Sequence, residues 1–157
     1  MHQQSLVPFL GNVPSLESVE FSRAHYTMNL VLGLSFVKGR FAVRVADDGL
    51  TSFGLPKGAF ALIQDVSMLK NDCGIYLVQY EGKVALKLVE RSENELVTLR
   101  VSGDKITSLT ITLDEITIVG WYEGCIHPEF ADLRLTNQLE LKLDNAALQN
   151  EYTMNTV

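Results

Sequence analysis

Short apolar segments, separated by turn-forming residues at intervals of roughly 8–12 residues, make up the middle of this chain. Residues 75–80 and 83–89 are joined by Glu81-Gly82, a pair that favours a β-hairpin. Residues 41–45 alternate in the manner of a half-buried strand. This spacing predicts an all-β or mostly β domain. Strands are expected over residues 41–45, 59–64, 75–80, 83–89, 96–101, 106–113 and 116–122.

The two ends of the chain are less regular. Residues 7–13 are expected to be extended, and residues 15–26 to form a loop. Residues 26–37 hold an apolar run that suits a strand or a buried turn. After residue 127, leucines recur at a spacing of two, which suits strands, and at a spacing of four, which suits a helix. Residues 128–157 are therefore expected to form a C-terminal extension with a short strand or helix.

The composition limits the classes of protein to which the chain can belong. With 157 residues, 46% hydrophobic and 20% charged, it is long enough for one domain with a real core. The net charge is −6 and no run of Lys and Arg stands out, so direct binding to nucleic acid is not expected. No apolar stretch approaches the roughly 20 residues that cross a bilayer, and the N-terminus does not resemble a signal peptide. We expect a cytoplasmic protein that does not associate with membranes.

Metal and redox chemistry find little support in the sequence. Cys73 and Cys125 lie far apart, and reduced thiols are expected in a cytosolic protein. His2, His25 and His127 are scattered and lack the spacing of metal ligands. The sequence contains no phosphate-binding loop and no dinucleotide fingerprint. We expect no cofactor and no bound metal.

Several segments occur in the order and spacing of a known peptidase fold. Residues 41–45 are similar to a strand that leads to a catalytic serine, and residues 74–91 to a hairpin that carries a catalytic lysine. Over roughly residues 6–125, the chain resembles the C-terminal domain of the LexA/UmuD-type self-cleaving serine peptidases. The resemblance implies curled antiparallel β-sheets in a domain of residues 1–127, with residues 128–157 as an extension of the same domain. The similar segments are residues 6–13, 41–45, 54–63, 74–91, 96–99, 106–111 and 116–120.

The family's nucleophile loop reads roughly Gly-Asp-Ser-Met, and the matching residues here are Asp47-Asp48-Gly49-Leu50. Gly49 stands in the position of the serine and has no side chain that can react. Lys87 matches the family's lysine, which must be desolvated to accept a proton near pH 7. Without the resemblance, Lys87 is an ordinary outward-facing strand residue and Gly49 a turn glycine with a positive φ angle. The acid pair Asp47-Asp48 is interpreted as solvated.

The region that the family cleaves is also altered. Its scissile bond usually lies in an Ala-Gly or Cys-Gly pair, whereas the matching residues here are Pro14, Ser15 and Leu16. A proline beside the bond restricts the backbone, and Leu16 replaces a small residue. The loss of both the nucleophile and the cleavage sequence indicates a protein that does not cleave itself. The other interpretation of this stretch is a plain N-terminal loop.

A second alignment retains a serine. Residues 65–68, Asp-Val-Ser-Met, are superficially closer to the family's loop, and in that alignment Ser67 is the nucleophile and Lys105 its partner. Lys105 lies in a polar turn, which is a poor place to lower the pKa of a lysine. This alignment also leaves too little chain for the closing strands. Ser52 is a further candidate nucleophile, and for both serines a solvated loop residue is the simpler interpretation.

The leading hypothesis is a catalytically inactive LexA/UmuD-like domain, a pseudo-peptidase that acts through association. The resemblance implies a setting in transcriptional repression, the SOS stress response or phage regulation. The domain would form a homodimer or pair with a repressor or polymerase accessory protein. Because the family's C-terminal strands often form the dimer contact, Trp121 and Tyr122 are candidate interface residues. The alternatives are an active self-cleaving peptidase that uses Ser67 or Ser52 with Lys87, and a β-rich scaffold whose likeness is fortuitous.

Overall fold

The computed structural model describes residues 4–21, 26–33, 36–101 and 108–135. Within these residues the protein is mostly β, as the sequence predicts, and its helices are three short 3-10 turns. In chain order the elements are β1 (Ser5–Val13), β2 (Met28–Leu32), β3 (Arg40–Val45), η1 (Thr51–Phe53), β4 (Phe60–Asp65), β5 (Cys73–Tyr80), β6 (Lys83–Arg91), β7 (Leu96–Arg100), β8 (Leu109–Thr112), η2 (Leu113–Glu115), β9 (Ile116–Ile126), η3 (Pro128–Phe130) and β10 (Leu133–Leu135).

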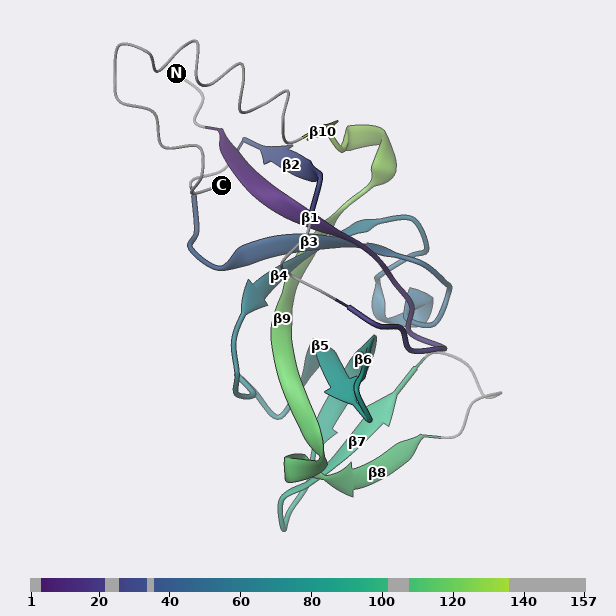
Figure 1. The fold of residues 1–157 in the computed structure, drawn as a ribbon. Helices are drawn as coiled ribbons and strands as arrows, with labels where there is room; N and C mark the ends of the chain where they lie inside the picture. Colours follow the sequence, from purple (N-terminus) through teal and green to yellow (C-terminus); the bar gives the residue numbers. More distant parts are fainter. Residues whose placement is uncertain (1–3, 22–25, 34–35, 102–107, 136–157) are drawn as a thin grey trace.

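The ten strands form one curled sheet that is not closed, in the order β10-β2-β1-β3-β4-β9-β5-β6-β7-β8 (Figure 1). All neighbours are antiparallel except β1 and β3, which are parallel. The curled and largely antiparallel sheet agrees with the expected fold class, and the one parallel pair makes it a mixed sheet. The chain returns from β1 along β2 on one side and then crosses to the other side of β1, so that β3 runs in the direction of β1.

The long strand β9 joins the two halves of the molecule (Figure 1). Its residues 120–126 pair with β4, and its residues 116–121 pair with β5. The ladder between β4 and β9 and the ladder between β5 and β9 each have a register shift, close to the residues at which β9 passes from pairing with one strand to pairing with the other. Gly120 lies at the junction, because it is opposite both Asp65 of β4 and Leu77 of β5. The upper half thus contains β10, β2, β1, β3 and β4, and the lower half contains β5 to β8.

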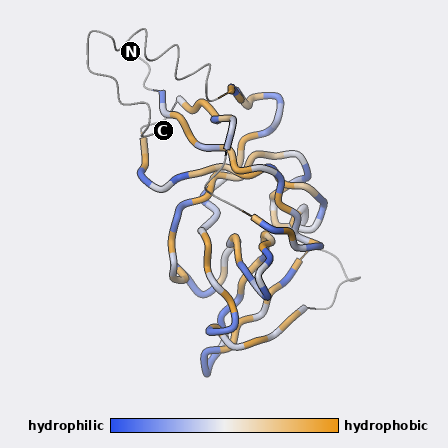
Figure 2. Tube along the Cα trace, in the orientation of Figure 1, coloured by the Kyte–Doolittle hydropathy of each residue, from blue (hydrophilic) through white to orange (hydrophobic). Residues whose placement is uncertain are grey.

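Buried side chains form three clusters along this curled sheet. The central cluster joins strand residues such as Val43 and Leu86 to Leu50 and Leu55 from the loop after β3. A second cluster lies between β5, β7 and β9, and a third between β1, β2 and β4. Hydrophobic stretches concentrate where the strands cross in the middle of the molecule, whereas the turns at the lower end are hydrophilic (Figure 2). Leu50 and Leu55 therefore anchor the loop after β3 in the central cluster.

The turn between β5 and β6 and the described part of the C-terminal extension have structures that the sequence predicts. Glu81 and Gly82 have φ angles of 52° and 81°, the left-handed values that a two-residue hairpin requires, and they join β5 to β6 as predicted. In the extension, residues 133–135 form a strand that pairs with β2. Residues 136–157 lie outside the described residues.

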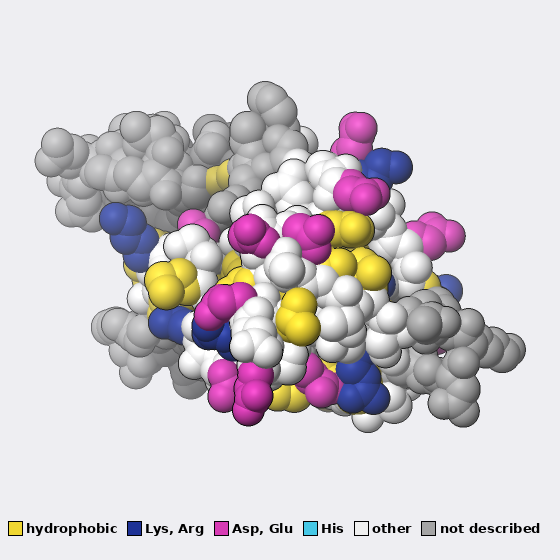
Figure 3. All heavy atoms as spheres, turned by 90° about the horizontal axis from the view of Figure 1, so that it is seen from below, with side chains coloured by type: hydrophobic (Ala, Val, Ile, Leu, Met, Phe, Trp, Pro, Cys, Tyr) yellow, Lys and Arg dark blue, Asp and Glu magenta, His cyan; other side chains and the backbone are white. Residues whose placement is uncertain are grey.

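The face seen from below carries scattered Asp and Glu side chains, with Lys and Arg between them (Figure 3). On the described part of this face, Lys and Arg do not merge into one continuous patch. None of the helices within the described residues has the length and hydropathy that are needed to cross a bilayer.

Candidate functional site

The N-terminal segment after β1 lies against the first half of β6. Strand β7 pairs only with residues 88–91 of β6, which leaves the edge of the first half open. There, Val19 and Val84 exchange two backbone hydrogen bonds of 2.9 and 2.8 Å, and the Leu86 amide donates to the Pro14 carbonyl at 2.9 Å. The described part of the predicted loop over residues 15–26 is irregular as expected, apart from the isolated bridge at Val19. Residues 14–19, the docked segment, lie along this open edge of the sheet.

Asp47 holds the docked segment from the other side. The Ser15 amide donates to both carboxylate oxygens of Asp47, at 3.1 and 3.0 Å, and the Leu16 amide donates to Oδ2 at 2.9 Å. The Gly49 amide donates to Oδ1 at 3.0 Å. The interpretation of Asp47 as a solvated acid is therefore wrong for this residue, whereas Asp48 is exposed. Sequence reasoning missed Asp47, since its partners come from a distant segment and are backbone groups.

Lys87 projects from β6 toward the same segment. Its Nζ donates a hydrogen bond to the Ser15 carbonyl oxygen. The side chain is half-buried, so Lys87 is not an ordinary solvated strand residue. Burial lowers the pKa of Lys87 below its ordinary value, and the nearby Asp47 carboxylate opposes part of that shift. The amine is thus neutral more readily than that of an exposed lysine.

Gly49 lies where a side chain has no room. A Cβ atom at this position would be 2.6 Å from the Cβ of Ser15 and 3.0 Å from the Asp47 Oδ1. Gly49 is not among the glycines with positive φ, so the interpretation as a left-handed turn residue is wrong. The residue is required here by the close approach of the docked segment.

The structure therefore brings together three positions that the sequence analysis named separately. Gly49 packs against Ser15, and the Lys87 Nζ donates to the Ser15 carbonyl. Ser15 is fully buried, and its Oγ has no hydrogen-bond partner among the described residues. Its neighbour Leu16 is 39% exposed. In the peptide bond from Ser15 to Leu16, the carbonyl thus accepts from Lys87 and the amide donates to Asp47.

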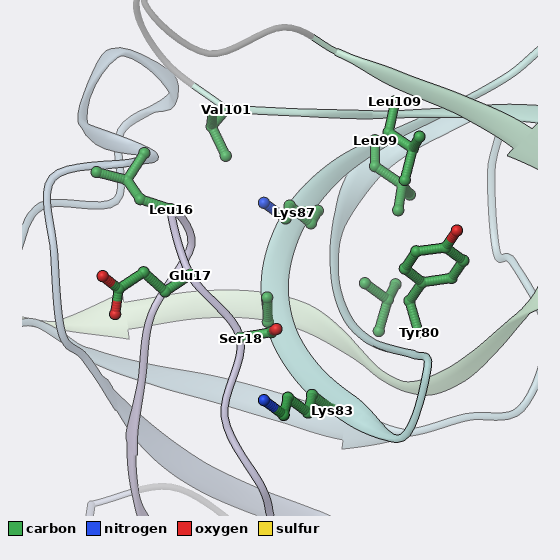
Figure 4. A pocket seen from close by; sticks show the side chains of 11 residues that line it. Leu16, Glu17, Ser18, Tyr80, Lys83, Lys87, Leu99, Val101 and Leu109 are labelled. Atoms are coloured by element: carbon green, nitrogen blue, oxygen red, sulfur yellow. The ribbon is translucent and has the colours of Figure 1, made fainter.

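A hollow of about 200 Å³ opens beside Lys87, between the docked segment and the ends of β7 and β8 (Figure 4). In the figure, Lys87 points toward Leu16 and Val101, whereas the carboxylate of Glu17 points away from β6. The walls are mostly apolar. The hollow is lined by Leu16, Glu17, Ser18, Val78, Tyr80, Lys83, Ala85, Lys87, Leu99, Val101 and Leu109.

The chemistry of the arrangement can be judged from its groups. A serine peptidase needs a hydroxyl beside a base, and a backbone N–H that stabilises the oxyanion. Gly49 supplies no hydroxyl, and its N–H is occupied by the Asp47 carboxylate. A carboxylate at that place also repels a developing negative charge. At this place the Asp47 carboxylate binds the amides of Ser15, Leu16 and Gly49.

The alternative nucleophiles do not meet Lys87. Ser67 is exposed in the loop after β4 and lines a separate hollow with Arg91 and Glu95. Ser52 is exposed on η1 and does not line the Lys87 hollow. Lys105, the partner of Ser67 in the second alignment, lies outside the described residues.

Trp121 and Tyr122, the candidate interface residues, are partly buried against the protein's own core. Trp121 packs on the second cluster and Tyr122 on the central one. Burial, together with a hydrogen bond to Cys125, raises the pKa of the Tyr122 phenol above its ordinary value. Because Trp121 is paired with both β4 and β5, an interface at this residue would involve its side chain and not strand pairing.

Cysteine and histidine residues do not form a further site in the described part of the chain. Cys73 is exposed, Cys125 is half-buried, and both thiols are free. His127 precedes η3, whereas His2 and His25 lie outside the described residues. Within the described ranges, His, Cys, Asp and Glu form no group of three or more that could hold a metal ion.

Comparison with known proteins does not assign the chain to a family. No protein-family model and no curated protein matches it.

Proposed function

We propose that this chain is a non-cleaving domain of the LexA/UmuD type that acts through association and not through catalysis. The observation that carries the proposal is the convergence of Gly49, Lys87 and Ser15. The resemblance assigned these residues to the nucleophile, lysine and cleavage positions from sequence order alone. A fortuitous likeness gives no reason for these three positions to meet in space.

The same contacts argue against an active enzyme. The space in which a serine side chain would stand at residue 49 is filled by Ser15. The amide that would stabilise an oxyanion is bonded to Asp47. Neither Ser67 nor Ser52 lines the hollow beside Lys87. These features support a pseudo-peptidase whose former cleft is filled by its own N-terminal segment.

The role that fits such a domain is a dimerisation or regulatory interaction module in the cytoplasm. Its setting would be transcriptional repression, the SOS response or phage regulation, as a homodimer or with a repressor or polymerase accessory protein. One feature of the surface supports association. Strand β8 forms an edge of the sheet, is largely exposed and contains only Leu, Thr and Ile. Uncharged edge strands readily pair with another chain.

Cleavage is tested on the full chain by intact-mass measurement after incubation at pH 7 to 10. A serine–lysine pair would be most active at the alkaline end, where the amine is neutral. We expect no change in mass. Loss of residues 1–15 in the wild type, but not in a Lys87→Met variant, would show an active peptidase and overturn the proposal.

Association is tested separately by sedimentation velocity over a range of protein concentrations. We expect a dimer that populates as the concentration rises. A protein that remains monomeric at every concentration contradicts the homodimer. This readout is independent of the mass measurement. The absence of cleavage and the association of the domain are therefore tested as two separate claims, and either can be refuted while the other stands.

A further inference from the structure

Three properties of Lys87 bear on the chemistry of its amine. Its amine lies at the wall of the hollow lined by Leu16, Leu99 and Val101 (Figure 4). Among the described residues it has one hydrogen-bond acceptor, the Ser15 carbonyl, although an ammonium group can donate three bonds. Unlike Lys83, which lies on the same strand and lines the same hollow, it is half-buried. The amine is thus accessible from an apolar space.

The charges around the amine determine its reactivity. Burial lowers the pKa of Lys87, the Asp47 carboxylate partly restores it, and the Glu17 carboxylate points away from β6. A desolvated lysine in a hydrophobic site is activated as a nucleophile, because more of it is neutral at pH 7.

We propose that the Lys87 Nζ is a covalent site for short aliphatic aldehydes that enter the hollow. The hollow of about 200 Å³ is large enough for a five-carbon chain, since an apolar cavity of about 150 Å³ accepts benzene. Its apolar walls attract the alkyl chain and direct the carbonyl carbon to the Lys87 amine, which borders them from a half-buried position. The inference is independent of the proposed function.

The reaction is balanced without a further reactant. The neutral amine adds its electron pair to the aldehyde carbon, and the carbonyl oxygen takes up the amine proton to give a carbinolamine. Loss of that hydroxyl group with the second amine proton releases water and leaves a C=N bond between the aldehyde carbon and Nζ. The neutral imine has no N–H, so it no longer donates to the Ser15 carbonyl.

The test uses the folded full chain with 3-methylbutanal and sodium cyanoborohydride at pH 7.5. Cyanoborohydride delivers hydride to the imine carbon and fixes the adduct as a secondary amine. Peptide mapping at low total modification then gives a rate for each lysine, and the α-amino group is left out because its ordinary pKa is about 8. We expect Lys87 to be labelled about tenfold faster than Lys83, its matched control on the same strand.

Two comparisons show whether the fold and the hollow cause this preference. In guanidinium chloride the preference for Lys87 should disappear, and with formaldehyde, which has no alkyl chain, it should be smaller. Labelling of Lys83 or another lysine as fast as Lys87 overturns the proposal. It is also overturned if the preference persists in the unfolded chain, or if formaldehyde is as selective as 3-methylbutanal.

Discussion

Gly49 and Ser15 come so close that their positions cannot both carry a Cβ atom at the present spacing. We predict that Gly49→Ala lowers the free energy of unfolding by about 1–3 kcal/mol, the usual cost of overpacking. Ser15→Gly in the same chain should recover part of this loss, because it removes the carbon that the new methyl group meets. Urea denaturation of the two single variants and the double variant measures the coupling. Additive effects would contradict a direct contact.

Asp47 and Asp48 are adjacent acids with different environments, and they form a natural matched pair. Asp47 accepts hydrogen bonds from the amides of Ser15, Leu16 and Gly49, whereas Asp48 is exposed. We predict that Asp47→Asn costs about 2 kcal/mol, because bonds to a charged acceptor are replaced by fewer bonds to a neutral one. Asp48→Asn should change stability by less than about 0.5 kcal/mol. Equal losses in thermal or urea unfolding would show that Asp47 does not hold the docked segment.

At this scale, the sequence predicted residue types better than it predicted their partners. Gly49, Lys87 and Ser15 could be singled out because each stands at a position of a known pattern. The role of Asp47 could not be found in this way, since its bonds go to backbone groups that any residue supplies. Likewise, the need for glycine at position 49 arises from a side chain that lies 34 residues earlier in the sequence.

Among the structural elements, β9 depends most on one residue. A Cβ atom at Gly120 would be 2.2 Å from the Ile63 Cγ2 and 3.0 Å from the Gln64 carbonyl oxygen. Gly124 lies in the same strand and has nothing within 4 Å of such an atom. We predict that Gly120→Ala costs about 1–3 kcal/mol, whereas Gly124→Ala is close to neutral. Urea denaturation of both variants checks this, and a similar loss in each would contradict the close approach at Gly120.

The strands themselves followed from local patterns, but their arrangement did not. Apolar segments and turn residues are local signals, so β3 to β7 were expected close to where they lie. The parallel pairing of β1 with β3, and the change of partner within β9, depend on contacts between segments far apart in the chain. Hydrophobic alternation specifies which face of a strand is buried, and leaves open which neighbour it pairs with.

For the molecule as a whole, the sharing of β9 between both halves implies that they unfold together. Trp121, the single tryptophan, packs on the second cluster and so reports on the lower half, whereas far-UV circular dichroism reports on all strands. We predict that both signals give the same urea midpoint, as a two-state transition requires. Gly120→Ala, at the junction, should shift both midpoints by the same amount. A fluorescence transition that separates from the circular dichroism transition, in the wild type or in this variant, would show that the halves are independent.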